Sequence, residues 1–350
     1  MKILIVKMSA LGDIIHALPV LDYLHRVSPG IEIDWVVEEP FREVLEGNPL
    51  VRRLYTVRTK VWRKKPFASA TRREIGELKA SLREHQYDFV FDIQGNLKSG
   101  LVCWLSGVEH RIGFEKDALQ ESVNLLFTTR QVPLRMIDRH ITDQYLRLVS
   151  VPFGKDFREF SLITDIWTSA EDDAAAEALL ATLDDGLVFL FHQGTTWQTK
   201  LWKQEGWAEL GADLLRRHPH SSILLSWGNE DERRAVVDIA SAIGSGARVV
   251  DRYSLKGFAA LLKKVDVVVG GDTGPVHLAA AVGTPTVSFY RASDGMRSGP
   301  RGSQHVVIQA QLPCTGCFKT SCDKDAACRD SITVEALTAG IDKVLSHHCA

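Results

Sequence analysis

A regular alternation of short apolar runs with amphipathic segments is the feature that most constrains the fold of this chain. In the first half, apolar runs lie near 2–7, 31–38, 53–57 and 88–93, and helical patterns lie near 13–27, 70–85 and 96–106. In the second half, strands are expected near 187–192, 222–227, 247–250, 266–270 and 285–290, and helices near 204–217, 230–243, 254–264 and 275–282. This repeated strand–helix–strand order predicts parallel sheets that are covered by helices on both faces.

The two halves are separated by a polar, acidic segment from Glu159 to Asp185, which includes an Ala-rich helical run at 170–182. We place the boundary near residue 165. The prediction is a first Rossmann-like domain at 1–165 and a second at 166–350, the latter ending in a Cys-rich segment and a helix. Two such domains commonly hold a ligand in a central cleft between them, at the carboxyl ends of their strands.

Composition and charge exclude several classes of protein. The chain has 350 residues, of which 45% are hydrophobic and 25% charged, as expected for a soluble globular protein. A formal net charge of −2 argues against a nucleic-acid partner, because nucleic-acid affinity rests on a basic surface. Met1 and Lys2 lead directly into a strand without a signal peptide, and no apolar run reaches the roughly 18 residues of a membrane helix, so a cytoplasmic location is expected.

The segment Val267–Leu278 is typical of a phosphate-binding turn. An apolar strand breaks at Gly270 and Gly271, and Pro275 suits the first turn of a following helix. The backbone N–H groups of Thr273, Gly274 and Val276 would then face an anion, since a helix N-terminus carries about half a positive charge. Thr273 adds a hydroxyl group and His277 an imidazole. The alternative is a buried strand followed by a helix that Asp272 caps.

The turn after the first strand places a carboxylate at the start of a helix. Small residues in Ser9–Gly12 bring backbone N–H groups close to a ligand, and Asp13 falls in the first helical turn. An ionised carboxylate there can accept a proton from a substrate hydroxyl group. The alternative is an ordinary Asp at a helix start.

Two further strand ends in the second half carry polar side chains. Thr195 and Thr196 can donate to phosphate oxygens, and Lys200 can supply the positive charge that a metal ion supplies elsewhere. Glu232 lies beyond the next strand, where an acidic residue commonly binds ribose hydroxyl groups. A solvated lysine and a solvated acidic helix start are the alternatives.

Taken together, these segments resemble glycosyltransferase family 9, the bacterial heptosyltransferases that build the inner core of lipopolysaccharide. The resemblance covers most of the chain and rests on four motifs in the order of the family: Lys7-x-Ser9-x-x-Gly12-Asp13, Asp92-Ile93-Gln94-Gly95-Asn96-x-Lys98-Ser99, Thr195-Thr196 with Lys200 and Trp202, and Asp272-Thr273-Gly274-x-x-His277. It implies an α/β protein of the GT-B fold and a metal-independent, inverting transfer from an ADP-sugar.

The resemblance also implies a role for individual residues. Asp13 would be the general base, and Ser9, Gly12 and Gln94 would contact the acceptor. The donor would be bound by Thr195, Thr196, Lys200, Glu232 at the ribose, Tyr253 near adenine, Asp272, Thr273, Gly274 and His277.

The basic segment from Arg58 to Lys65 resembles the stretch with which family members that add the first heptose contact the acidic Kdo sugars of Kdo-lipid A. Five cations among these eight residues, Arg63 and Lys64 included, suit an anionic acceptor at a membrane surface, whereas a solvated basic loop is the alternative. One departure is Gln120-Glu121, where that enzyme has an Arg-Glu pair. Arg111, Lys116 and Arg139 are candidates to compensate for it.

Four cysteines lie close together in sequence near the C-terminus: Cys314, Cys317, Cys322 and Cys328. In a reducing compartment such clustering favours a metal over disulfides, but the spacing is not that of two CxxC pairs. The alternatives are therefore a structural metal site and a set of free thiols, and no catalytic metal is expected.

The function predicted from the sequence is transfer of heptose from ADP-heptose to the Kdo region of lipid A, by an enzyme on the inner face of the inner membrane. The nearest alternative is a second heptosyltransferase that acts on a heptosylated acceptor. From other classes, the alternatives are an NAD-dependent oxidoreductase, although no G-x-G-x-x-G follows a predicted strand, and a non-catalytic nucleotide-sugar binder.

Overall fold

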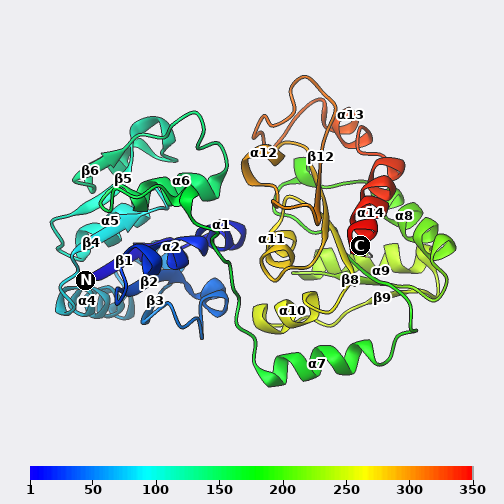
Figure 1. The fold of residues 1–350 in the computed structure, drawn as a ribbon, viewed down its shortest axis with the longest axis horizontal. Coiled ribbons are helices and arrows are strands. Elements are labelled where there is room, and N and C mark those ends of the chain that lie inside the picture. Colours follow the sequence, from blue (N-terminus) through cyan, green and yellow to red (C-terminus); the bar gives the residue numbers. More distant parts are fainter. Residues whose placement is uncertain (349–350) are drawn as a thin grey trace. The chain divides into compact units, whose positions relative to one another are not determined.

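The chain forms two compact units, Met1–Trp167 (unit 1) and Thr168–Ala350 (unit 2), in a computed structural model that describes residues 1–348. Each unit contains one six-stranded sheet in which all paired strands are parallel, with helices on both faces (Figure 1). The two Rossmann-like parallel-sheet domains predicted from the strand–helix alternation are thus confirmed.

The sheet of unit 1 has the order β3-β2-β1-β4-β5-β6. Its strands are β1 (Lys2–Val6), β2 (Glu32–Glu38), β3 (Arg53–Val57), β4 (Phe89–Asp92), β5 (Arg111–Phe114) and β6 (Arg130–Val132). Its helices are α1 (Leu11–Ala17), α2 (Pro19–Val27), α3 (Thr59–Lys64), α4 (Ser69–Glu84), α5 (Leu97–Leu105) and α6 (Ile141–Ser150), with short 3₁₀ helices at Glu39–Val44, Lys116–Ala118, Ser122–Leu126 and Phe157–Glu159. Ile3, Leu4 and Ile5 are fully buried, as expected of a central strand covered on both faces.

The sheet of unit 2 has the order β12-β11-β10-β7-β8-β9. Its strands are β7 (Val188–His192), β8 (Ser222–Ser226), β9 (Ala247–Val249), β10 (Val267–Gly271), β11 (Thr286–Tyr290) and β12 (His305–Gln309). Its helices are α7 (Ala170–Leu180), α8 (Gln204–Arg217), α9 (Glu230–Ile243), α10 (Leu255–Leu262), α11 (Gly274–Ala281), α12 (Gly295–Ser298), α13 (Asp325–Asp330) and α14 (Val334–His348), with a 3₁₀ turn at Gln198–Lys200.

An aromatic cluster holds the core of unit 2 together. The ring of Trp207 lies 5.2 Å from that of Phe191, 5.3 Å from that of Trp202 and 5.9 Å from that of Phe289, between centroids. The indole N–H of Trp202 donates to the carbonyl of Ile332 at 2.8 Å. Trp202, one of the motif residues, therefore serves the core rather than a ligand.

Two predicted segments differ from the structure. The helix expected over 13–27 is two helices, because Pro19 has no N–H to donate and starts a new helix after Leu18. The basic segment expected as a loop contains the short helix α3. Among the helices that the structure describes, none is both long and apolar enough to cross a membrane.

Candidate functional site

The carboxyl ends of four neighbouring strands in unit 2 bring together every residue that the sequence predicts for the donor. Strands β10, β7, β8 and β9 are consecutive in the sheet, and Gly270 pairs with His192, which in turn pairs with Ser226. The loops after these strands carry, in that spatial order, Asp272 to His277, then Thr195 to Lys200, then Glu232, and then Tyr253. The candidate site is thus one continuous edge of a sheet.

Asp272 connects three parts of the site at the β10 end of this edge. One carboxylate oxygen accepts from the ammonium group of Lys200 at 2.6 Å, and the other lies 3.1 Å from Nε2 of His277. The Ser298 hydroxyl, which the sequence did not single out, donates to Asp272 at 3.5 Å. Burial alone would raise the pKa of Asp272, but the hydrogen bond and charge of His277 and the charge of Lys200 outweigh it and hold this pKa well below its usual range. Asp272 is therefore ionised and cross-links the strand end, the neighbouring loop and α11.

At the N-terminus of α11, backbone N–H groups have no acceptor within the helix. The N-cap is Thr273, not Asp272, so the predicted alternative of a helix capped by Asp272 is wrong. The first backbone bond beyond it runs from His277 to Thr273, so the N–H groups of Gly274 and Val276 have no acceptor within the helix. Gly270 is required by close packing, because a Cβ atom there would lie 2.6 Å from a methyl group of Val276.

The loop after β7 places Lys200 against its neighbours. The Lys200 ammonium lies 4.7 Å from the ring centre of Trp197, and the side chain is 18% exposed. Thr195 is half-buried and Thr196 is exposed. Lys200 is thus held in place and is not the solvated lysine that the alternative describes, and the same loop exposes Thr196.

Glu232 is fixed at the start of α9. Its carboxylate accepts from the backbone N–H of Gly228 at 2.7 Å and from the side-chain amide of Asn229 at 2.7 Å. A Cβ atom on Gly194 would lie 2.4 Å from this carboxyl group, so the glycine allows the β7 loop to approach Glu232. Tyr253 precedes α10, and burial, together with the charge of Asp251, raises the pKa of its hydroxyl group. Both side chains lie at the edge, away from Asp272.

Unit 1 carries the predicted base at the end of β1. The Asp13 carboxylate is 33% exposed and lies 3.6 Å from the ammonium group of Lys7, which is 1% exposed. That ammonium group also lies 4.8 Å from the ring centre of Tyr145 on α6. Asp13 accepts from the backbone N–H of Ala10 at 3.4 Å, so it does contribute to the helix start. Nothing in the sequence around Tyr145 indicated this contact, because Tyr145 lies on a helix far along the chain from Lys7.

Gln94 holds the turn that precedes Asp13. Its side-chain carbonyl accepts from the backbone N–H groups of Met8 and Ser9, each at 3.1 Å. Gln94 is itself placed by the buried carboxyl group of Asp92, which accepts from the backbone N–H groups of Gln94 and Gly95. Burial raises the pKa of Asp92. The second motif therefore supports the first, and Ser9 and Gly12 are half-exposed beside it.

The cations predicted for the acceptor divide into two groups. Arg63 and Lys64 are exposed on α3. Arg58, by contrast, forms an ion pair with Glu74, whose pKa is lowered by hydrogen bonds from Trp62 and Arg58. Arg111 donates to the carbonyl groups of Phe127 and Val108, which tie its side chain to the neighbouring loops.

The four clustered cysteines do not form a metal site. Cys314 and Cys317 are exposed, and Cys328 packs against the core, where burial raises its pKa. Within residues 1–348 no group of three or more His, Cys, Asp or Glu side chains is arranged to hold a metal ion. The predicted alternative of a structural metal at these cysteines therefore does not fit, and Cys349 lies outside the described residues.

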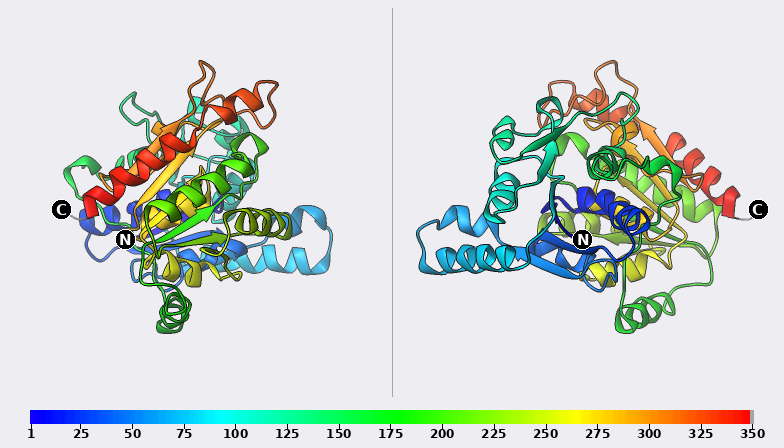
Figure 2. Two further views of the ribbon diagram at one scale, coloured as in Figure 1. Left: turned by 90° about the vertical axis from the view of Figure 1, so that its right-hand side faces the viewer. Right: turned by 60° about the vertical axis from the view of Figure 1, so that its left-hand side comes forward.

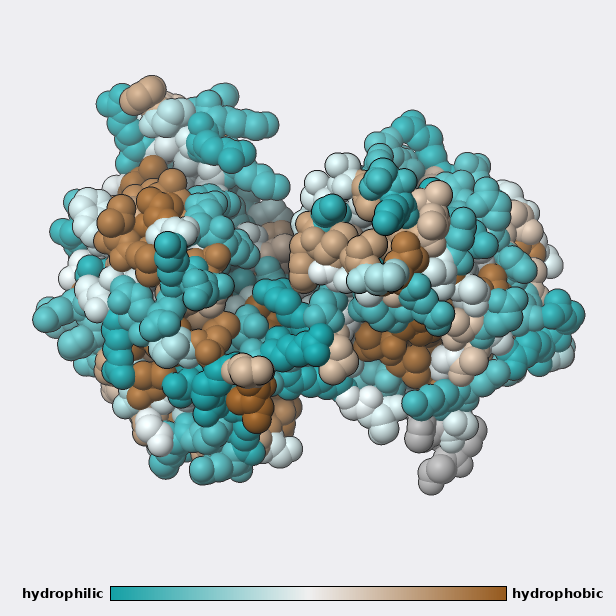
Figure 3. Space-filling view, turned by 90° about the horizontal axis from the view of Figure 1, so that it is seen from above, coloured by the Kyte–Doolittle hydropathy of each residue, from teal (hydrophilic) through white to brown (hydrophobic). Residues whose placement is uncertain are grey.

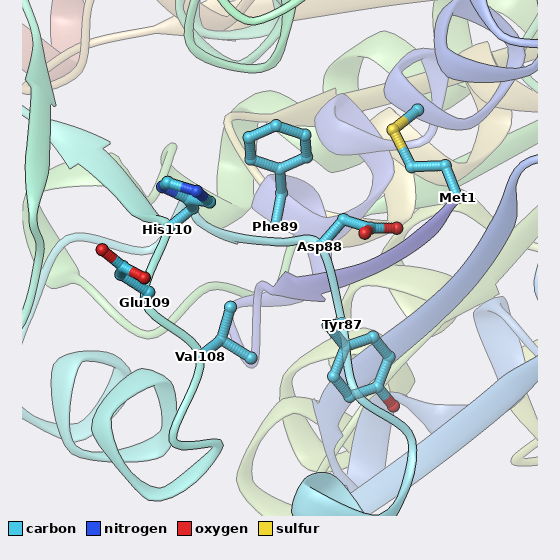
Figure 4. A pocket seen from close by; sticks show the side chains of 7 residues that line it. All are labelled: Met1, Tyr87, Asp88, Phe89, Val108, Glu109 and His110. Carbon is cyan, nitrogen blue, oxygen red and sulfur yellow. The ribbon is translucent and has the colours of Figure 1, made fainter.

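A surface hollow of about 650 Å³ lies at the opposite edge of the unit 1 sheet (Figure 4). It is lined by Met1, Tyr87, Asp88, Phe89, Val108, Glu109 and His110, which precede or begin the strands. Asp88 is already used, since its carboxylate accepts from the backbone N–H of Lys2 at 2.7 Å. None of the predicted site residues lines this hollow, so it is not the candidate site.

Comparison with known proteins agrees with the sequence motifs. Residues 75–327 match glycosyltransferase family 9 (heptosyltransferase). The chain is 34% identical over 323 residues to lipopolysaccharide heptosyltransferase 1 of Pseudomonas aeruginosa. The matched stretch covers 92% of this chain and 87% of that protein.

Solved structures show the same fold. A structure of the Escherichia coli heptosyltransferase WaaC with ADP has a TM-score of 0.76 and 27% identity, over 98% of this chain and all of the other. A structure of E. coli ADP-heptose heptosyltransferase II has a TM-score of 0.78 at 20% identity and spans both chains in full, which supports the fold alone. The predicted GT-B fold is confirmed, and an oxidoreductase is excluded. The chain belongs to glycosyltransferase family 9, the heptosyltransferases.

Proposed function

We propose that this protein transfers heptose from ADP-heptose to the Kdo region of lipid A, with inversion at the anomeric carbon. The observation that carries the donor assignment is the order of the loops along the unit 2 edge. Cationic and N–H groups lie at β10 and β7, the acidic Glu232 at β8 and the aromatic Tyr253 at β9. This order is that of diphosphate, ribose and adenine in the donor. A structure of a family member holds an ADP-heptose analogue.

The departing ADP carries negative charge on its diphosphate, which the site would have to stabilise. Lys200 and the N-terminus of α11 would stabilise the departing diphosphate, with Thr196 and His277 as further donors of hydrogen bonds. An ionised Asp272 repels a diphosphate, so we assign it a positioning role: it holds Lys200 and His277 at the edge. Thr195, Thr273 and Gly274 complete this part of the proposed donor site.

Asp13 would act as the general base toward the acceptor hydroxyl group. It is accessible, and Lys7 fixes its position through charge attraction while remaining buried itself. Gln94 would act chiefly by shaping the turn through which Ser9 and Gly12 face the acceptor. Deprotonation of the acceptor on unit 1 and stabilisation of the diphosphate on unit 2 are the two requirements of a direct, inverting displacement.

The acceptor assignment rests on the similarity to heptosyltransferase 1 enzymes and on α3. Arg63 and Lys64 are exposed and would contact the carboxylates of the Kdo sugars. An acceptor embedded in lipid would place the enzyme on the cytoplasmic side of the inner membrane, as a peripheral protein. The alternative is a heptosyltransferase II, which acts on a heptosylated acceptor.

The proposal is tested by incubating the protein with ADP-heptose and Kdo-lipid A in excess EDTA, with product detected by mass and its anomeric configuration by NMR. We expect release of ADP together with an inverted heptoside, without added metal. Activity that is lost in EDTA and restored by Mg²⁺, or retention of the donor configuration, would refute the mechanism.

A further inference from the structure

Two turns of unit 1 expose large apolar side chains that do not pack in its core. We call them the Met136–Ile137 tip and the Phe67 tip. Met136 is 102% exposed and Ile137, next to it, is 64% exposed, while Phe67 is 81% exposed at the other tip. Much of the surface of unit 1 is polar, with apolar side chains gathered only in places (Figure 3). Large apolar side chains held in water at the end of a turn are unfavourable unless they have a binding partner.

A closed, ion-paired turn carries Met136 and Ile137. The backbone N–H of Asp138 donates to the carbonyl of Arg135 at 2.8 Å, which closes a turn around the two apolar residues. The fully buried carboxylate of Asp138 accepts from Arg135 at 3.1 Å and from Arg158 at 2.7 Å. A preformed apolar tip loses little conformational entropy when it binds.

The Phe67 tip lies within a strongly basic stretch of the sequence. Residues 58–73 contain seven Lys or Arg residues and no Asp or Glu. The tip is fastened at its base, where the Trp62 indole donates to Glu74 on α4 at 2.8 Å. Helices α3 and α4 stand out from the body of unit 1 in both views (Figure 2). Lys64, Lys65 and Phe67 are all exposed on this projection.

The strands that lead to the two tips lie on either side of the strand that leads to the predicted base. Phe67 follows β3 and Met136 follows β6, the two outer strands of the sheet, and both follow the carboxyl ends of these strands. Asp13 follows β1, an inner strand. Five strand spacings separate β3 from β6, about 24 Å across the edge. His140, which ends the Met136 loop, lies 5.3 Å from His16 on α1 between ring centres, so that loop contacts the helix that carries Asp13.

We propose that unit 1 docks on an anionic lipid surface through Phe67, Met136 and Ile137, which insert into the interface and present the edge around Asp13 to a lipid-embedded acceptor. This inference rests on the proposed function for the nature of the acceptor. The exposed cation Lys65 beside Phe67 matches the negative charge of such a surface.

The experiment measures partitioning onto vesicles of phosphatidylglycerol and phosphatidylcholine, and onto phosphatidylcholine alone. The variant combines Phe67→Ser, Met136→Ser and Ile137→Ser. Its control is Ile163→Ser, since Ile163 is 63% exposed in the same unit and belongs to neither tip. We expect the wild type to prefer anionic vesicles, the triple variant to bind them about 10-fold or more weakly, and the control to stay within two-fold. All variants should melt like the wild type.

Kinetics distinguish docking from contact with the sugar. For the triple variant, kcat/KM should fall on acceptor embedded in vesicles and stay unchanged on the same acceptor without its acyl chains. Equal vesicle binding by the triple variant and the wild type, or an equal loss on both acceptors, would overturn the inference. Partitioning requires no turnover, so failure of the proposed function would appear separately, as absence of transfer to the acyl-free acceptor.

Discussion

Replacing Lys200 with alanine separates its binding role from its structural one. The Lys200–Asp272 pair is short, at 2.6 Å, and its side chains are 18% and 11% exposed. A hydrogen bond to a charged group contributes about 1.5–3 kcal/mol. Because Asp272 already neutralises part of the lysine charge, we expect the lower part of this range for ADP, about 1.5–2 kcal/mol, or a 10- to 30-fold weaker Kd.

The same substitution should lower the free energy of unfolding of unit 2 by about 1–3 kcal/mol. The Asp272 carboxylate would keep its contact with His277 but lose the ammonium group of Lys200. Combining Lys200→Ala with Asp272→Asn should recover stability, because the unpaired charge is gone, without recovering ADP affinity. Calorimetric titration with ADP and denaturant unfolding measure the two effects, with Lys203→Ala as a control in the same segment. An ADP Kd within two-fold of wild type in Lys200→Ala, or joint recovery of both properties in the double variant, would refute the reasoning.

Three further predictions concern the base, the acceptor and pH. Asp13→Asn should lower kcat by roughly 10²-fold or more and leave ADP-heptose affinity within a few-fold, as rapid-quench kinetics and donor titration would measure; near-normal turnover would remove Asp13 from the mechanism. Reversing Arg63 and Lys64 to Glu should raise the acceptor KM without changing donor Kd, and the effect should shrink with added salt; an unchanged acceptor KM would show that these cations are only solvated. Burial lowers the pKa of His192 to about 4 from an ordinary 6.5. As the pH falls from about 6.5 to 4, the imidazole is therefore protonated in the unfolded chain but not in the folded one, and the free energy of unfolding decreases. This loss, about 3 kcal/mol in full, should be smaller in His192→Gln when unfolding is followed against pH, and identical profiles would contradict it.

The sheets were predictable from the sequence because local patterns determine them. Runs such as Val267–Val269 are apolar enough to be buried on both faces, and the glycines that follow mark the strand ends. Strands β5, β6 and β12 were not predicted: β5 and β6 have only three or four residues, and the polar residues Arg111, Arg130 and His305 begin the three strands. The split at Pro19 was visible as a proline, but the apolar spacing continues through it.

The site was predictable only in its residue types. The sequence indicated Lys200, Asp272 and His277 separately, but their mutual contacts depend on β7 and β10 being neighbours in the sheet. In the same way, Lys7 reaches Asp13 locally, whereas Tyr145 comes from a distant helix. Pairings of this kind result from the order of the strands, which no local pattern encodes.

The acceptor determines which heptose of the inner core this protein would add, and a single competition assay identifies that acceptor. The protein is given ADP-heptose with equal amounts of Kdo-lipid A and of the same acceptor already carrying one heptose, and the products are identified by mass. We expect one added heptose on Kdo-lipid A and little change in the heptosylated acceptor. Transfer confined to the heptosylated acceptor would contradict it.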